Sequence, residues 1–270
     1  MPYDLARMAR QAGVRRDVTL RPIFPTQSQA QDLARLYVDV VKVWERADLL
    51  RGYDGATRDS PSDSAATIEQ AEDEISRLVL AFGANVRQWA LRIERWHRKK
   101  WTDAVYSVTG VDLTTILTAQ PVQESIETFL ARNVALVKDV SDQARGRIAD
   151  AVFRGYQQRQ PAREVAKEIR KATAMARDRS IRIASHQTAN LSAAFDRERK
   201  DEAGITLFRW RHSGKKNPRQ DHKARDGLVY FLKTGKPYQR SGETIPADDR
   251  AGVPPYCGCR EQAYLPIMDE

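Results

Sequence analysis

The feature that most constrains the fold of this chain is the recurrence of apolar residues at spacings of three and four over most of its length. This spacing places the apolar side chains on one face of an α-helix and leaves the other face polar. The pattern predicts helices over residues 26–51, 67–101, 122–156, 162–171 and 176–203. Amphipathic helices must bury their apolar faces against one another, so we expect a long helical body.

The pattern changes after Gly204, which is well placed as the C-cap of the last helix. Residues 205–213 alternate apolar and polar side chains, and residues 228–232 form a second apolar run. Alternation with a period of two is typical of a strand with one buried face. The expected fold class is therefore mainly α, with a long helical body followed by a small C-terminal α+β unit.

Two segments are expected to lack regular structure. Residues 1–25 contain three prolines and little periodicity, which indicates an extended N-terminal arm. Residues 51–65 are rich in Gly, Ser, Asp and Pro, which indicates a linker inside a helical region that spans residues 26–139. No stretch reaches the roughly 18 consecutive apolar residues that a membrane span needs, so no span is expected.

Positive charge is concentrated in one segment. Between Arg209 and Arg240, ten Lys and Arg residues stand against two Asp, so this segment carries +8 of the net +9 of the chain. A local basic surface favours a polyanionic partner, either nucleic acid or an acidic protein face. A well-solvated loop region explains the same charges equally well. The candidate DNA- or partner-binding residues are Arg209, Arg211, Lys215, Lys216, Arg219, Lys223 and Arg225.

The order of motifs in the last third of the chain is distinctive. Trp210 lies in the first strand-like run, R-x-x-H-x-x-x-D-G follows at residues 219–227, and a Pro-Pro pair precedes C-G-C at residues 257–259. This order resembles the Mu F-like phage head-morphogenesis family, whose members show a tryptophan strand, the same R-x-x-H-x-x-x-D-G element, a loop rich in Pro and Gly, and N-C-R-C. The resemblance covers residues 140–266, which we expect to form a Mu F-like head-morphogenesis domain. By this resemblance the structural motif residues are Trp210, His222, Asp226, Gly227, Cys257 and Cys259.

The chain departs from the family pattern at several positions. Ser185, His186 and Gln187 replace an Arg-Thr-Glu triplet on the preceding helix, Tyr256 replaces the Asn before the first cysteine, and Gly258 replaces the Arg between the cysteines. If the Arg and Glu served a reaction, this chain has lost it, whereas Ser and Gln can still pack and bridge. The departures therefore favour a structural role.

The resemblance implies a structural minor head protein of a tailed bacteriophage and not an enzyme. Such a protein enters the virion at low copy during capsid assembly in the host cytoplasm, near the portal vertex and inside the capsid. The expected partners are the portal protein, the major capsid protein or scaffold, and double-stranded DNA bound without sequence preference. The alternative is a helical carrier with a C-terminal nuclease or toxin module, in which His212, His222 and Asp221 act as acid and base on a phosphodiester.

Cys257 and Cys259 are the two cysteines of the chain, and their number excludes a disulfide framework. Residues i and i+2 of an extended strand point the same way, so both thiols can face one metal ion. His222 and His212, or Asp221, would complete a tetrahedral zinc shell. The competing interpretation is two reduced cysteines packed as small apolar side chains. Because only two thiols are present and His212 must come from a separate strand, we expect no metal and no other cofactor.

Overall fold

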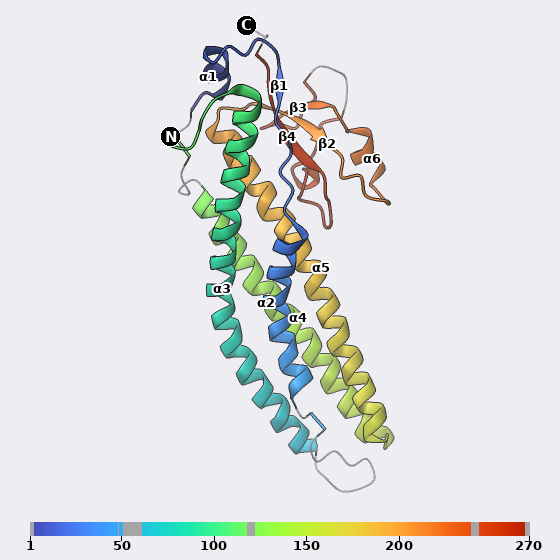
Figure 1. Cartoon of the computed structure of the whole chain (residues 1–270). Coiled ribbons are helices and arrows are strands. Elements are labelled where there is room, and N and C mark those ends of the chain that lie inside the picture. The colour runs from blue at the N-terminus through green and yellow to red at the C-terminus, as the bar shows by residue number, and fades with distance from the viewer. Residues whose placement is uncertain (1–2, 48, 51–60, 118–121, 239–242, 268–270) are drawn as a thin grey trace. The chain divides into compact units, whose positions relative to one another are not determined.

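The structure is a computed structural model that describes residues 3–47, 49–50, 61–117, 122–238 and 243–267, without the side chains of residues 61–65 (Figure 1). The helices are α1 (Leu5–Gln11), α2 (Gln27–Arg46), α3 (Pro61–Thr109), α4 (Gln123–Gln158), α5 (Ala162–Glu202), α6 (Gln220–Ala224) and the short 3-10 helix η2 (Ala247–Asp249). The strands are β1 (Val18–Thr19), β2 (Leu207–Arg211), β3 (Val229–Phe231) and β4 (Arg260–Leu265). Helices dominate and the strands form one small antiparallel sheet, which confirms the predicted fold class. None of the helices in the described part of the chain is long and apolar enough to cross a membrane.

The chain folds into two compact units, each built from separated stretches of sequence. The first, called here the sheet unit, comprises Met1–Thr26, Ala90–Glu127 and His186–Glu270. The second, called the helical unit, comprises Gln27–Trp89 and Thr128–Ser185. The contiguous division expected from the sequence, at residues 26–139 and 140–266, differs from this division because α3, α4 and α5 each contribute to both units.

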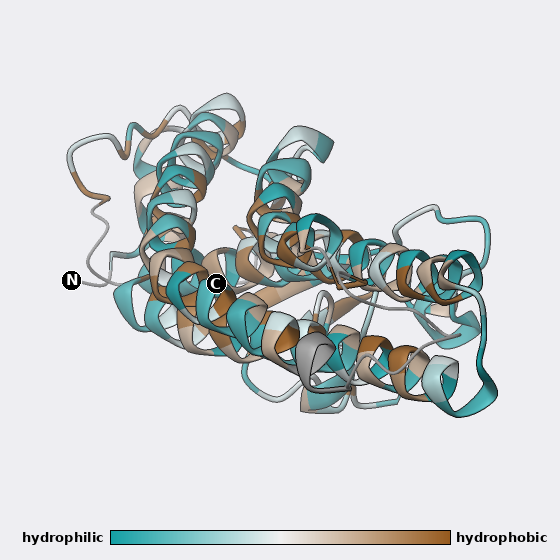
Figure 2. Cartoon of the chain, turned by 90° about the horizontal axis from the view of Figure 1, so that it is seen from below, coloured by the Kyte–Doolittle hydropathy of each residue, from teal (hydrophilic) through white to brown (hydrophobic). Residues whose placement is uncertain are grey.

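In the helical unit, α2 packs against α3 and α4 through aromatic side chains that also carry polar groups. The ring of Tyr37 meets the ring of Phe82 edge-on, with the centroids 5.1 Å apart. The Tyr37 hydroxyl donates to Asn133 Oδ1 at 2.7 Å, and Trp44 Nε1 donates to Ser141 Oγ at 3.3 Å. Buried polar groups are stable only when they are paired, so these contacts fix how the helices pack. Figure 2 shows the hydrophobic and hydrophilic residues that recur along the helices and make this packing possible.

In the sheet unit the strand order is β1-β4-β2-β3, and all neighbouring strands are antiparallel (Figure 1). β4 lies between β1 and β2, with Leu265 opposite Val18 and Ala263 opposite Phe208. The strands expected at residues 205–213 and 228–232 are thereby confirmed as β2 and β3. Two clusters of buried side chains support the sheet. One includes Leu5, Ala9, Val18, Leu20, Trp101, Val105, Ile205 and Leu265, and the other comprises Phe208, Trp210, Tyr230, Ile245, Ala251, Cys257 and Cys259.

The prediction of an extended arm at residues 1–25 is wrong, because this segment forms α1 and β1. Leu5 and Ala9, one helical turn apart, are fully buried. The Asp4 carboxylate caps α1 by accepting from the backbone N–H of Arg7 at 2.9 Å. The prolines obscure this short helix in the sequence. β1 consists of two residues whose partner lies at the other end of the chain, so local periodicity does not report it.

Two further predictions are wrong: the break between two helices at residues 172–175, and the position at which α3 begins. Residues 162–171 and 176–203 belong to the single helix α5, because no Pro or Gly interrupts them. α3 begins at Pro61, so the last five residues of the linker expected at 51–65 are helical, and the others lie outside the described residues. Proline is favourable in the first turn of a helix, where its missing N–H would have no partner. The expected C-cap at Gly204 is confirmed by its φ of +65°.

A buried ion pair and a buried histidine–carboxylate contact join α3 and α5 within the sheet unit. Arg199 is 1% exposed and donates to Glu94 at 2.7 Å and to Glu202 at 2.6 Å. Nε2 of His97 lies 3.1 Å from Oδ1 of Asp196 on the same two helices. A buried charge that loses its partner destabilises a fold far more than an exposed one does. These pairs therefore hold α3 and α5 in one arrangement within the sheet unit.

We expect Arg199→Met to lower the free energy of unfolding by on the order of 3–5 kcal/mol, because it leaves the Glu94 carboxylate buried without its main partner. Denaturant titration of the purified chain measures this loss. Lys99→Met is the matched control: it removes an exposed pair with Asp103 on α3, and we expect a loss of no more than about 1 kcal/mol. Equal losses in the two variants would contradict the importance of the buried pair.

Candidate functional site

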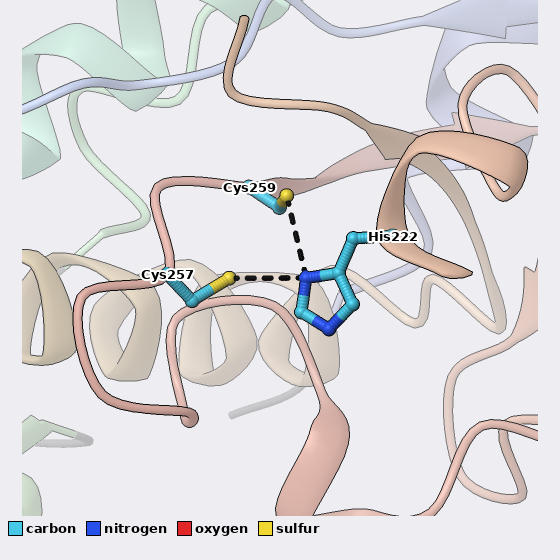
Figure 3. A group of neighbouring side chains, drawn as sticks. All are labelled: His222, Cys257 and Cys259. Atoms are coloured by element: carbon cyan, nitrogen blue, oxygen red, sulfur yellow. Dashed lines mark hydrogen bonds between the residues drawn. The ribbon is translucent and has the colours of Figure 1, made fainter. Parts of the chain in front are cut away.

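The C-terminal motif residues converge on the imidazole of His222, which is buried on α6. Its Nδ1 lies 3.6 Å from Sγ of Cys257 and 3.7 Å from Sγ of Cys259 (Figure 3). Both cysteines are buried, both are free thiols, and they lie on the segment that leads into β4. The two thiols thus face one point, as the C-x-C spacing predicted, and a histidine nitrogen lies at that point.

The other ring nitrogen of His222 determines which nitrogen carries the proton. Nε2 lies 2.8 Å from Oδ1 of Asp249 in η2. A carboxylate only accepts hydrogen bonds, so Nε2 of the neutral ring carries the proton and Nδ1 presents its lone pair to the thiols. Burial is the largest single influence on the pKa of Asp249 and would raise it, but hydrogen bonds and charge interactions with His222 and Arg225 together hold this pKa below its usual value. Sequence reasoning missed Asp249, because an Asp in a polar loop signals only a turn.

The pKa values of the two thiols are shifted in opposite directions. A hydrogen bond with Cys259 is the largest cause that lowers the pKa of Cys257 to about 5. The same hydrogen bond, together with burial, raises the pKa of Cys259 above its usual value. The two cysteines share one hydrogen bond, and their pKa values therefore move in opposite directions.

Trp210, Asp226 and Gly227 hold the segment that carries His222. The Trp210 ring meets the imidazole edge-on, with the centroids 5.1 Å apart. Asp226 Oδ1 accepts from the backbone N–H of His212 at 2.8 Å. Gly227 adopts a φ of +82°, and its N–H donates to the carbonyl of Trp210 at 2.9 Å. The Asp-Gly pair therefore closes the loop that carries α6 between β2 and β3.

A cavity of about 290 Å³ lies beside the cysteines and His222. Its lining includes His212, Lys215, Arg219, His222, Cys257 and Cys259. Nδ1 of His212 accepts from the backbone N–H of Gly214 at 3.2 Å, so the proton of the neutral ring lies on Nε2. This Nε2 is buried and has no hydrogen-bond partner among the described residues. The structure thus brings the four residues named as potential zinc ligands to one cavity, and three of them lie in mutual contact.

The seven basic residues expected to bind DNA or a partner divide into two groups. The exposed ones are Arg211, Lys215, Lys216, Arg219 and Lys223. Arg209 and Arg225 are half-buried. The Arg209 guanidinium lies 5.2 Å from the centroid of the Tyr264 ring, and Arg225 donates to Asp249 at 2.5 Å. Arg240, the end of the basic segment, lies outside the described residues. Five of the seven side chains are therefore accessible to a partner, while two serve packing.

Sequence reasoning also missed the buried charges at the start of β4. Glu261 is 5% exposed, accepts from Arg250 Nε at 2.7 Å and lies 3.8 Å from Nζ of Lys200. Burial is the largest single influence on the pKa of Glu261 and would raise it, but the hydrogen bond from Arg250 and the charges of Lys200 and Arg250 together keep this pKa below its usual value. Arg260 is buried as well and donates to the carbonyl of Ile23 at 3.2 Å. No local signal marks these positions, because charged residues ordinarily face solvent.

Residues 144–261 match the protein family described as phage Mu protein F like protein. This segment, a little under half of the chain, is similar to that family. The match begins in α4 and ends in β4, so it contains His222, both cysteines and the exposed basic residues. It confirms the resemblance drawn from the motifs, and the family indicates a phage head-morphogenesis protein. No curated protein and no solved structure matches the chain.

The Mu F-like domain of this chain departs from the family pattern at Tyr256, which has a φ of +60°. This left-handed conformation costs a residue with a large side chain about 1–2 kcal/mol, whereas Asn tolerates it better. Asn is also the residue that the N-C-R-C pattern has at this position. In this chain the N–H of Tyr256 donates to His186 Nδ1 at 3.2 Å, and its carbonyl accepts from Lys215 Nζ. These contacts hold Tyr256 in place.

We expect Tyr256→Asn to raise the free energy of unfolding by about 0.5–1 kcal/mol, because Asn adopts a positive φ at lower cost. Denaturant titration against the wild type measures the change. The control is Tyr106→Asn: Tyr106 is also exposed but lies inside α3, where Tyr and Asn have similar helix propensities, so stability should change little. If Tyr256→Asn proves less stable than the wild type, the ring contact with His186 outweighs the backbone strain.

Proposed function

We propose that this chain is a structural minor head protein of a tailed bacteriophage. It is incorporated at low copy near the portal and inside the capsid during head assembly, and it remains in the virion. The observation that carries this proposal is the Mu F-like match over residues 144–261. The partners proposed on this basis are the portal protein and the major capsid protein or scaffold.

The contacts of the motif residues support a structural role and not an enzymatic one. One ring nitrogen of His222 binds Asp249, and the other faces the two thiols. Trp210 packs on the same ring, and Asp226 bonds the backbone after β2. A general acid or base must exchange a proton with its substrate, and both ring nitrogens of His222 are engaged within the domain. This arrangement weighs against the nuclease or toxin module, in which His222 would act on a phosphodiester.

The exposed basic residues support a second contact, with packaged DNA. The side chains of Arg211, Lys216 and Lys223 lie on the surface of the Mu F-like domain. Lysine and arginine bind the phosphates of double-stranded DNA and release condensed counterions, which gives affinity without sequence preference. We propose that these residues contact the DNA inside the head.

We expect the chain to co-elute with the portal protein of its own phage when the two are co-expressed and separated by size exclusion. The control is the portal protein of an unrelated phage, with which no complex should form. A chain that elutes as a free monomer in the presence of its cognate portal and major capsid proteins would contradict the proposed structural role.

We expect double-stranded DNA of any sequence to bind with an affinity that falls steeply as salt rises, measured by fluorescence anisotropy. Lys216→Glu with Lys223→Glu should weaken binding equally for all sequences and reduce the salt slope by up to about 2, because two phosphate contacts are lost. Lys167→Glu with Lys171→Glu is the control: it changes the net charge equally on the exposed surface of α5 and should have little effect. Sequence preference, or equal losses in both double variants, would contradict a contact made by this surface.

A further inference from the structure

Three side-chain atoms that bind soft metal ions converge at one point of the sheet unit. They are Sγ of Cys257, Sγ of Cys259 and Nδ1 of His222, all on buried residues and all within 4.8 Å of one another (Figure 3). We propose that these three atoms bind a Zn²⁺ ion whose fourth ligand is a water molecule in the adjacent cavity. This inference goes beyond the head function proposed above, which requires no metal.

The spacing of the three atoms is that of a tetrahedral zinc shell. Zinc binds sulfur at about 2.3 Å and imidazole nitrogen at about 2.0–2.1 Å, so a tetrahedral angle separates the two ligands by about 3.6 Å. The observed S–N distances are 3.6 and 3.7 Å. Nδ1 has one lone pair, and it lies at nearly the same distance from both sulfurs. A metal ion satisfies all three atoms at once.

Asp249 orients His222 for metal binding. Nε2 of His222 donates to Asp249 at 2.8 Å, and Arg225 donates to the other carboxylate oxygen of Asp249 at 2.5 Å. Histidines that bind zinc commonly donate their second N–H to a carboxylate, which fixes the ring and makes the ligating nitrogen more basic. The outer contacts that such a site needs are therefore present before the metal arrives.

The three donor atoms favour zinc over other metal ions. A neighbouring group of potential ligands is less suitable for a cation. Two sulfurs and one imidazole nitrogen suit Zn²⁺, whereas Mg²⁺ and Ca²⁺ prefer oxygen. Asp221, His222 and Asp249 form a second group of potential ligands next to the first. Arg225 lies 3.6 Å from Asp221 and 2.5 Å from Asp249, so its positive charge opposes a cation there. His212 is not assigned as a ligand, because the proton of its neutral ring lies on Nε2, the nitrogen without a hydrogen-bond partner among the described residues.

The zinc ion joins two segments that the sequence separates. His222 comes from α6, and the cysteines come from the segment that leads into β4. Asp249 connects η2 to the same point through His222. A metal cross-link stabilises the folded state directly, because its ligands are not arranged in the unfolded chain. Chelation should therefore increase proteolysis around α6 and the cysteine segment and leave the helical unit resistant.

The first test is elemental analysis of the full chain, purified without a histidine tag. We expect about one zinc ion per chain, and Cys257→Ser and Cys259→Ser should each lose it. Asp249→Asn should retain the site but weaken zinc affinity by about 10–100-fold. Asp221→Asn and His212→Ala are matched controls that should keep the metal, because neither removes an assigned ligand. A zinc content near zero in the wild type would overturn the proposal, and so would a control variant that loses zinc as completely as the cysteine variants.

A second measurement on the wild type avoids variants that fail to fold. After zinc is removed with a chelator, added Co²⁺ should bind and produce the charge-transfer absorption of a thiolate–cobalt bond, together with the visible bands of tetrahedral Co²⁺. Cobalt binding without the thiolate absorption would overturn the assignment, as would a Cys257–Cys259 disulfide found by mass spectrometry in protein purified under reducing conditions. Neither result depends on portal binding, so failure of the zinc site and failure of the head function are distinguishable.

Discussion

The pairing of β4 with both β1 and β2 is the constraint on which the sheet unit depends. A strand at the centre of a sheet bonds on both sides, so β4 holds the N-terminal segment on one side and β2 on the other. Arg260 and Glu261 at its start are buried, and each therefore needs a partner. Arg260 donates to the carbonyl of Ile23, and Glu261 accepts from Arg250. β4 thus carries the two buried charges and also pairs the C-terminal segment with the N-terminal segment.

The cluster around His222 is built on the same strand. Cys259 directly precedes β4, so the sheet fixes where its sulfur lies, and the loop closed by Asp226 and Gly227 carries α6 to it. The motif residues of the Mu F-like domain therefore contact the His222 imidazole or hold the loop that carries it. Trp210 packs on the ring, and the thiols face Nδ1. This use of the motif residues is the physical basis for proposing a structural protein.

The sequence predicted what depends on local pattern. The helical character of α2 to α5, the strands at residues 205–213 and 228–232, and the C-cap at Gly204 were found, although α5 was predicted as two helices, because periodicity and glycine conformation are local properties. β1 and β4 were missed, since β1 is two residues long and β4 begins with charged residues that look exposed. At the site, the cysteines and His222 were grouped correctly, but Asp249 was not. Its role depends on a contact between η2 and α6, which no spacing in the sequence reports.

Native-state hydrogen exchange on the intact chain tests most directly whether β4 joins both ends of the chain into one cooperative unit. Backbone amides of β4 should be among the slowest to exchange in the sheet unit, and those of α1 that are bonded within the helix should open together with them, because one buried cluster contains Leu5, Ala9 and Leu265. The backbone N–H of Leu20 donates to the carbonyl of Ala263 in β4. If this N–H and the amides of α1 exchange at the rate of an unfolded peptide while β4 stays protected, the N-terminal segment is not part of this unit. That result would contradict the central claim.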